Sequence, residues 1–114
     1  MERKTILLSG KKVVYTDVDI DWDGRKEVVR IKKLSFGEML DLNQVSTKMS
    51  YASGQTQMSF DAKALSQECL LRSIIEAPFP VTLQGIRDLD KELGEKLVMT
   101  FNELNAPSEA KKDN

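Results

Sequence analysis

Hydrophobic and polar positions near the end of the chain recur with the period of an α-helix. Over residues 82–105 the apolar positions are spaced three and four apart, which is the repeat of one helix face. They are Ile86, Leu89, Leu93, Leu97, Phe101 and Leu104. A stripe of this kind must be covered, either by the rest of the chain or by a partner. A break near Asp90 divides the stretch into a short helix, capped by Thr82, and a longer one that ends before Pro107.

The first third of the chain alternates instead, with the period of a β-strand. Residues 5–8 predict a short strand, followed by a turn at residues 9–10. Over residues 14–22 apolar side chains alternate with acidic ones, which is typical of an antiparallel strand that is buried on one face. Residues 23–24, Asp-Gly, predict a turn, and residues 28–34 predict the returning strand.

The loop of this hairpin decides which residues face one another. A four-residue loop over residues 23–26 would place Ile20 opposite Val29, and acidic residues opposite cations on the other face. A two-residue loop would place Ile20 opposite Glu27. Because apolar pairs and opposite-charge pairs each stabilise a sheet by about 0.2–1 kcal/mol, we expect the four-residue loop.

The helical part is predicted to begin at Ser35. Ser35 and Glu38 have the spacing of a capping box, in which each side chain bonds to the other residue's backbone N–H. This first helix should end near Lys48. The polar residues 49–59, centred on Gly54, predict a loop.

A second helix is predicted to start at Asp61, a suitable N-cap, and to run to Glu76. Pro78 and Pro80 then end it, because a proline cannot continue the helical hydrogen-bond pattern.

Together these patterns predict one α+β domain over residues 1–105. An antiparallel β-hairpin or ribbon (residues 4–34) should be followed by a small bundle of three to four α-helices (residues 35–105). The polar residues 106–114 predict a flexible tail. A chain of 114 residues can bury a single modest core.

Composition narrows the class of partner. Lys and Arg number 17 and Asp and Glu 18, a net charge of −1, which is not the footprint of a nucleic-acid-binding protein. No apolar run approaches the roughly 18 residues that span a membrane, and the apolar start is too short for a signal peptide. The lone Cys69, beside Leu70 and Leu71, is typical of a buried thiol in a reducing compartment. We therefore expect a cytoplasmic protein that binds neither nucleic acid nor membrane.

Candidate catalytic groups are few. The chain has no histidine, no phosphate-binding loop and no Cys-x-x-Cys motif. Pairs of acids such as Asp88 and Asp90 fall on the exposed side of the last helical stretch, and nothing there suggests the cleft that acid–base catalysis needs. We expect no enzymatic activity, no cofactor and no metal.

The acidic run Asp19-x-Asp21-x-Asp23-Gly is the one motif that suggests a metal, because it opens like an EF-hand loop. Such a loop needs a glutamate at its twelfth position, and here that position is Arg30. The flanking residues also alternate like strands. The acidic outer face of a hairpin is therefore the favoured interpretation, and a calcium-binding module remains a weaker alternative.

The order of the parts resembles the tail assembly chaperones of long-tailed bacterial viruses and their prophage relatives. The resemblance covers most of residues 28–105 and rests on the start of the first helix (residues 31–42), the end of the second (74–79) and the closing phrases 89–97 and 101–105. It implies a non-catalytic role in the host-cell cytoplasm. Such proteins coat the tape measure protein, help recruit tail tube subunits, and in many families also exist as a longer frameshifted form.

The resemblance also suggests which residues bind a client. Apolar helix faces carrying Phe36, Leu40, Leu93, Leu97 and Phe101 are the candidate interaction residues, with construction of the domain's own core as the alternative. A different class of function is also open, a small structural or adaptor protein of a virion or of a contractile or tail-like particle, which would use edge strands for assembly. Whether the protein forms a homo-oligomer stays open as well.

Overall fold

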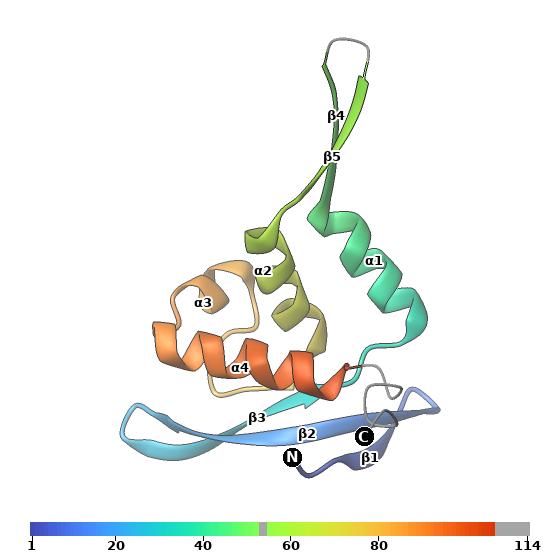
Figure 1. The fold of residues 1–114 in the computed structure, drawn as a ribbon. Helices are drawn as coiled ribbons and strands as arrows, with labels where there is room; N and C mark the ends of the chain where they lie inside the picture. Colours follow the sequence, from blue (N-terminus) through green and yellow to red (C-terminus); the bar gives the residue numbers. More distant parts are fainter. Residues whose placement is uncertain (53–54, 107–114) are drawn as a thin grey trace, which may run out of the picture.

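The computed structural model describes residues 1–52 and 55–106, and within them the chain has an α+β fold. A four-stranded antiparallel sheet, in the order β1-β2-β3-β6, lies against helices, and a separate two-stranded hairpin extends away from this body (Figure 1). The elements are β1 (Lys4–Leu8), β2 (Lys11–Trp22), β3 (Arg25–Lys32), α1 (Phe36–Ser46), β4 (Thr47–Ala52), β5 (Gln55–Phe60), α2 (Ala62–Ser73), β6 (Ile74–Glu76), α3 (Leu83–Arg87) and α4 (Lys91–Leu104). The predicted fold class is confirmed.

The β2–β3 hairpin has a two-residue turn, so the predicted four-residue loop was wrong. Trp22 pairs with Arg25, and Ile20 therefore lies opposite Glu27. Asp23 and Gly24 both have positive φ, 52° and 78°, which is the geometry that tight hairpins require and that Asp-Gly adopts readily. This register follows the local turn preference and still places Val18 opposite Val29 and Asp17 opposite Arg30. The error was two residues, an even number, so each side chain still lies on the predicted face.

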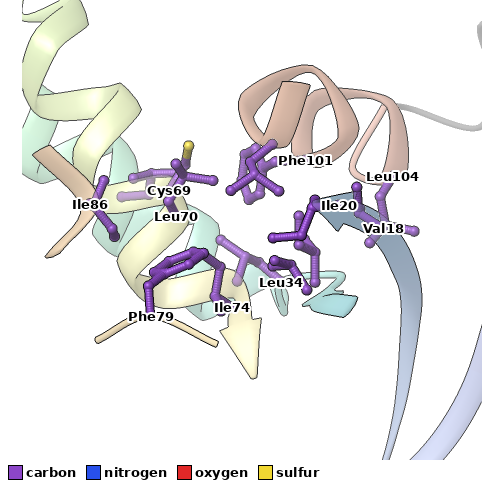
Figure 2. Packing of buried hydrophobic residues seen from close by; sticks show 14 residues of the cluster. Val18, Ile20, Leu34, Cys69, Leu70, Ile74, Phe79, Ile86, Phe101 and Leu104 are labelled. Carbon is purple, nitrogen blue, oxygen red and sulfur yellow. The ribbon is translucent and has the colours of Figure 1, made fainter. Parts of the chain in front are cut away.

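The apolar face of the sheet forms one side of the core. Val29 and Ile31 of β3 are fully buried, and Val18 and Ile20 of β2 are nearly so. The helices supply the other side, as Figure 2 shows for residues of α2, α3 and α4. The buried helical residues of this cluster are Leu42, Cys69, Leu70, Ile86, Leu97, Phe101 and Leu104. Three more core residues, Leu34, Ile74 and Phe79, lie between or beside the helices.

Helices begin where the sequence predicts, because each has an N-cap side chain that accepts a bond from its first turn. The Ser35 hydroxyl accepts from the Glu38 N–H while the Glu38 carboxylate accepts from the Ser35 N–H, a complete capping box. The side chains of Asp61, Thr82 and Asp90 each accept a bond from a backbone N–H in the first turn of α2, α3 and α4. The predicted break near Asp90 is the boundary between α3 and α4.

The second helix ends earlier than predicted. It stops at Ser73, and Ile74–Glu76 form the short strand β6 beside β3, with Ile74 opposite Ile31. Ile74 and Ile75 are β-branched, and the chain approaches a proline that a helix cannot include. The free edge of β3 offers backbone partners at this point, so strand pairing replaces the last helical turn.

The predicted loop at residues 49–59 is instead the β4–β5 hairpin, in which Thr47 pairs with Phe60 and Ala52 with Gln55. The Asp61 N–H donates to the Ser46 carbonyl at 2.7 Å, so the ends of α1 and α2 are joined. A segment that leaves one helix and returns to its neighbour runs antiparallel to itself, which favours pairing along its length. Residues 53–54 of the predicted loop, which include Gly54, and residues 107–114 of the predicted tail lie outside the described residues.

Candidate protein-interaction surface

The five predicted interaction residues divide into two groups. Leu97 is completely buried and Phe101 is 4% exposed, so both belong to the core, and Leu93 is half-buried against it. Phe36 and Leu40 are instead 80% and 52% exposed. Only these two are placed where a partner reaches them without opening the domain.

Phe36 and Leu40 share one side of α1. They are four residues apart, which places them one turn from each other on the same helix face. A different side of the helix faces inward, where Leu42 is 1% exposed and Ser46 is buried with its hydroxyl donating to the Leu42 carbonyl at 3.1 Å. Helix α1 is therefore held by its inner side while Phe36 and Leu40, here called the α1 face, stay exposed to water.

The start of α1 is held rigidly. Glu38, besides completing the capping box, accepts a hydrogen bond from Lys32 of β3 at 2.9 Å. Burial raises the pKa of the Glu38 carboxyl, but the bonds from Ser35 and Lys32 together outweigh burial and hold that pKa below its ordinary value. Phe36, the first helical residue, is thus presented by a helix end anchored to the sheet.

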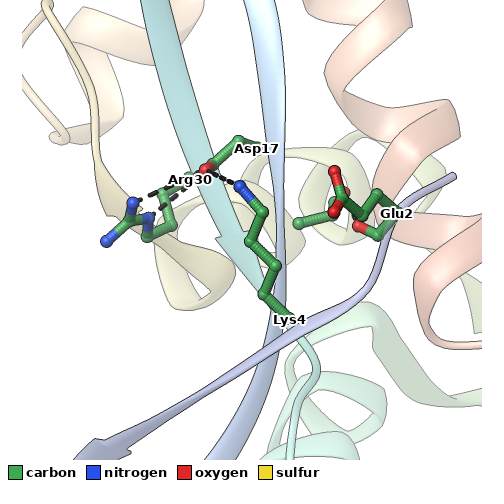
Figure 3. Close-up of polar contacts among 5 residues, drawn as sticks. Glu2, Lys4, Asp17 and Arg30 are labelled. Atoms are coloured by element: carbon green, nitrogen blue, oxygen red, sulfur yellow. Dashed lines mark hydrogen bonds and ion pairs between the residues drawn. The ribbon is translucent and has the colours of Figure 1, made fainter.

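The other face of the sheet carries a polar cluster that links three strands (Figure 3). The Asp17 carboxylate of β2 accepts from Arg30 Nε of β3 at 2.9 Å and from Lys4 Nζ of β1 at 3.1 Å. The hydrogen bond from Arg30 is the main reason that the pKa of Asp17 lies below its ordinary range. Arg30 also lies over the ring of Tyr15, 4.5 Å from its centroid. These charges satisfy one another, so the cluster stabilises the sheet.

The acidic residues that suggested a calcium-binding module lie in the β2–β3 hairpin. Asp19 and Asp21 belong to β2, and Asp23 occupies the turn. The Asp21 Oδ1 atom lies 3.8 Å from Lys26 Nζ on the other strand of the hairpin. An EF-hand loop lies between two helices, whereas this segment joins two strands. Within residues 1–52 and 55–106 no three acidic, cysteine or histidine side chains lie together as metal ligands would.

Cys69 is a core residue, as predicted. Its side chain is 2% exposed, and the thiol donates to the Ser66 carbonyl at 3.2 Å. Burial raises the pKa of the thiol to about 12. The un-ionised form therefore persists across the neutral range, and this thiol is a poor nucleophile in the folded protein.

Sequence reasoning did not single out the two apolar side chains that are most exposed after Phe36 among the described residues, Leu7 of β1 at 71% and Met99 of α4 at 69%. Met99 falls outside the three-and-four repeat that marks the buried side of α4, and this departure is the signal that identifies it. Leu7 lies on the outermost strand of the sheet.

In the described part of the chain, no helix is both long enough and apolar enough to cross a membrane. Comparison with protein-family models, with characterised proteins and with solved structures found no match to this chain.

Proposed function

We propose that this protein is a non-catalytic tail assembly chaperone of a long-tailed virus or prophage, working in the host-cell cytoplasm. It binds the tape measure protein and helps to recruit tail tube subunits around it. The proposal rests on the order of elements that resembles this family, and on one observation, the exposed α1 face. Phe36 is 80% exposed at the anchored end of a helix, where it gains about 1.5–3 kcal/mol if a client buries it.

The proposed mechanism is binding and release of the client, with no chemical reaction. The client is a long and largely helical protein whose apolar stripes would otherwise aggregate. The α1 face covers part of such a stripe, and tube subunits release the chaperone by binding the client more tightly. Modest affinity suits this exchange, because the chaperone must leave when the tube forms.

Co-expression of the chain with the tape measure protein of the same virus or prophage tests this function. We expect the wild-type chain to raise the yield of soluble tape measure protein, and the double variant F36E/L40E to lose this effect. Val45→Glu is the matched control, because Val45 is 43% exposed on a different side of α1. Both variants should have wild-type circular dichroism. The proposal fails if the wild-type chain leaves the client insoluble.

The alternative is a structural or adaptor protein of the particle, and the edge of the sheet favours it. Strand β1 ends the sheet, and its Leu7 is 71% exposed, so a neighbouring subunit has a strand to pair with. Quantitative mass spectrometry of purified particles separates the two functions. A chaperone is absent from finished particles, whereas an adaptor is present in a fixed ratio to the other tail proteins.

A further inference from the structure

A second surface, distinct from the α1 face, is an open groove of about 510 Å³ between α2 on one side and α3 and α4 on the other. Leu70 of α2 and Ile86 of α3 form its floor and also belong to the core (Figure 2). Val98 and Met99 of α4 form one wall, and Met99 is 69% exposed. An apolar floor between helices is the usual setting for a bound helix.

Cations dominate the rim of this groove, although the whole chain has a net charge of −1. Lys63, Arg87 and Lys91 come from α2, α3 and α4, and Glu95 is the one acid among the lining residues. Among the described residues, none of the three cations has an ion-pair partner. Lys91 also stands in the first turn of α4, where the helix dipole disfavours a positive charge. No ion pair within the described residues neutralises these charges, which suits them to an acidic partner.

Gly94 opens the α4 wall of the groove. A methyl group added at Gly94 would meet nothing within 4 Å, so packing within the chain does not require a glycine there. Gly85 of α3 differs, because a methyl group there would collide with the Pro80 carbonyl. A glycine inside a helix is less favourable for stability than an alanine. The glycine at position 94 leaves the α4 backbone open to close approach by a ligand in the groove.

We propose that this groove binds an amphipathic α-helix of the client, with an apolar stripe on the Leu70–Ile86 floor. Acidic residues beside that stripe pair with Lys63, Arg87 and Lys91, and the bound helix passes close to the α4 backbone at Gly94. This inference rests on the proposed chaperone function, which identifies the client as the source of the helix. The groove would be a second client-binding site in addition to the α1 face.

A designed peptide of about 20 residues, long enough to be helical, is the probe. It carries leucines at helical spacing with glutamates on both sides, and a second peptide has lysines in place of the glutamates. We expect the glutamate peptide to bind the ¹⁵N-labelled chain and to shift the amide signals of residues around Leu70 and Gly94. Added salt should weaken this binding.

Two sets of variants localise the site. The double variant R87E/K91E should bind the glutamate peptide on the order of tenfold more weakly and prefer the lysine peptide. Gly94→Leu should also weaken binding about tenfold by filling the groove. Gly37→Leu is the matched control, because Gly37 is a helical glycine with the same open surroundings, in α1 and away from the groove. Both glycine variants should keep or raise the melting temperature.

Three results would each overturn the groove proposal. The first is equal affinity of the wild-type chain for the two peptides, and the second is unchanged affinity of R87E/K91E for the glutamate peptide. The third is a shift of the same amide signals with protein concentration alone, because it would identify a second copy of the chain as the occupant.

The co-expression assay tests the groove proposal and the proposed function separately. If R87E/K91E solubilises the tape measure protein as the wild-type chain does, the groove is not the client site and the function stands. If the wild-type chain fails there but discriminates between the peptides, the function fails and the groove stands.

Discussion

Asp17 is the residue at which polar contacts from three strands meet. Its carboxylate accepts from Lys4 of β1 and Arg30 of β3, and its side chain is 18% exposed. Charge-assisted bonds of this kind are stronger than neutral ones, and partial exposure to water reduces their net contribution. A single carboxylate thus links the side chains of three neighbouring strands.

We expect Asp17→Asn to lower the free energy of unfolding by about 1 kcal/mol at pH 7. Arg30 and Lys4 hold the pKa of Asp17 below its ordinary value of 3.8, so the folded state favours the ionised carboxylate. This stability is present above that ordinary value and is lost as the pH falls through the lowered folded pKa. The gap between wild type and variant should therefore narrow at acidic pH.

Urea unfolding at pH 7 and at pH 2.5 measures the effect. Asp21→Asn is the control, because the Asp21 side chain is 81% exposed and its pair with Lys26 spans 3.8 Å. Equal losses in the two variants at pH 7 would contradict the role given to Asp17.

Cys69 should react with a thiol reagent at pH 8 on the order of a hundredfold more slowly in the native protein than in denaturant. Burial raises the pKa of the thiol to about 12 from the ordinary 9.0, so neither thiolate nor access is available in the folded state. Ionisation of the unfolded thiol should also lower stability as the pH rises above 9 toward 12. A native reaction as fast as the denatured one would exclude this burial.

At the scale of the element, local signals were the most informative. The side chains of Ser35, Asp61, Thr82 and Asp90 each cap a backbone N–H within three residues, so the sequence alone was enough to predict where all four described helices start. Helix ends and strand partners depend on more distant residues, and there the predictions were wrong at Ile74–Glu76 and at the β4–β5 hairpin.

The β2–β3 turn makes its own prediction. Gly24 has φ +78°, and a methyl group there would meet nothing within 4 Å, so any cost of substitution comes from the backbone. Gly24→Ala should lower the free energy of unfolding by about 1–2 kcal/mol. Gly37→Ala, a helical glycine in equally open surroundings, should instead be neutral or stabilise by up to about 1 kcal/mol. Chemical denaturation of both variants checks this, and similar effects in the two would be evidence against the tight turn.

At the scale of the whole molecule, α4 connects the helices to the sheet. Leu97 is completely buried between these layers, and Phe101 and Leu104 continue its buried side. The predicted stripe is therefore covered by the chain itself along most of α4. Among the described residues, the surfaces that remain for a partner are the α1 face, the groove beside Gly94 and the edge of β1.

Leu97→Ala should lower the free energy of unfolding by about 2–5 kcal/mol, because it leaves a cavity in the core. Phe36→Ala should change it by no more than about 0.5 kcal/mol, since the Phe36 side chain is 80% exposed. Thermal or urea unfolding of the two variants measures the difference. A large loss for Phe36→Ala would mean that the α1 face is structural and would weaken the proposed function.

The amino-acid sequence by itself determined the fold class, the buried face of β2 and the helix starts, because each depends on a period or a cap within a few residues. Only the tertiary structure decided that Ile74–Glu76 join the sheet and that residues 47–52 pair with residues 55–60, because β3 and the joined ends of α1 and α2 bring the backbone partners close. The tertiary structure also decided which candidate interaction residues are buried and which are exposed. Leu97 and Phe36 are both apolar residues on predicted helix faces, and only the arrangement of α1 and α4 around the sheet buries one and exposes the other.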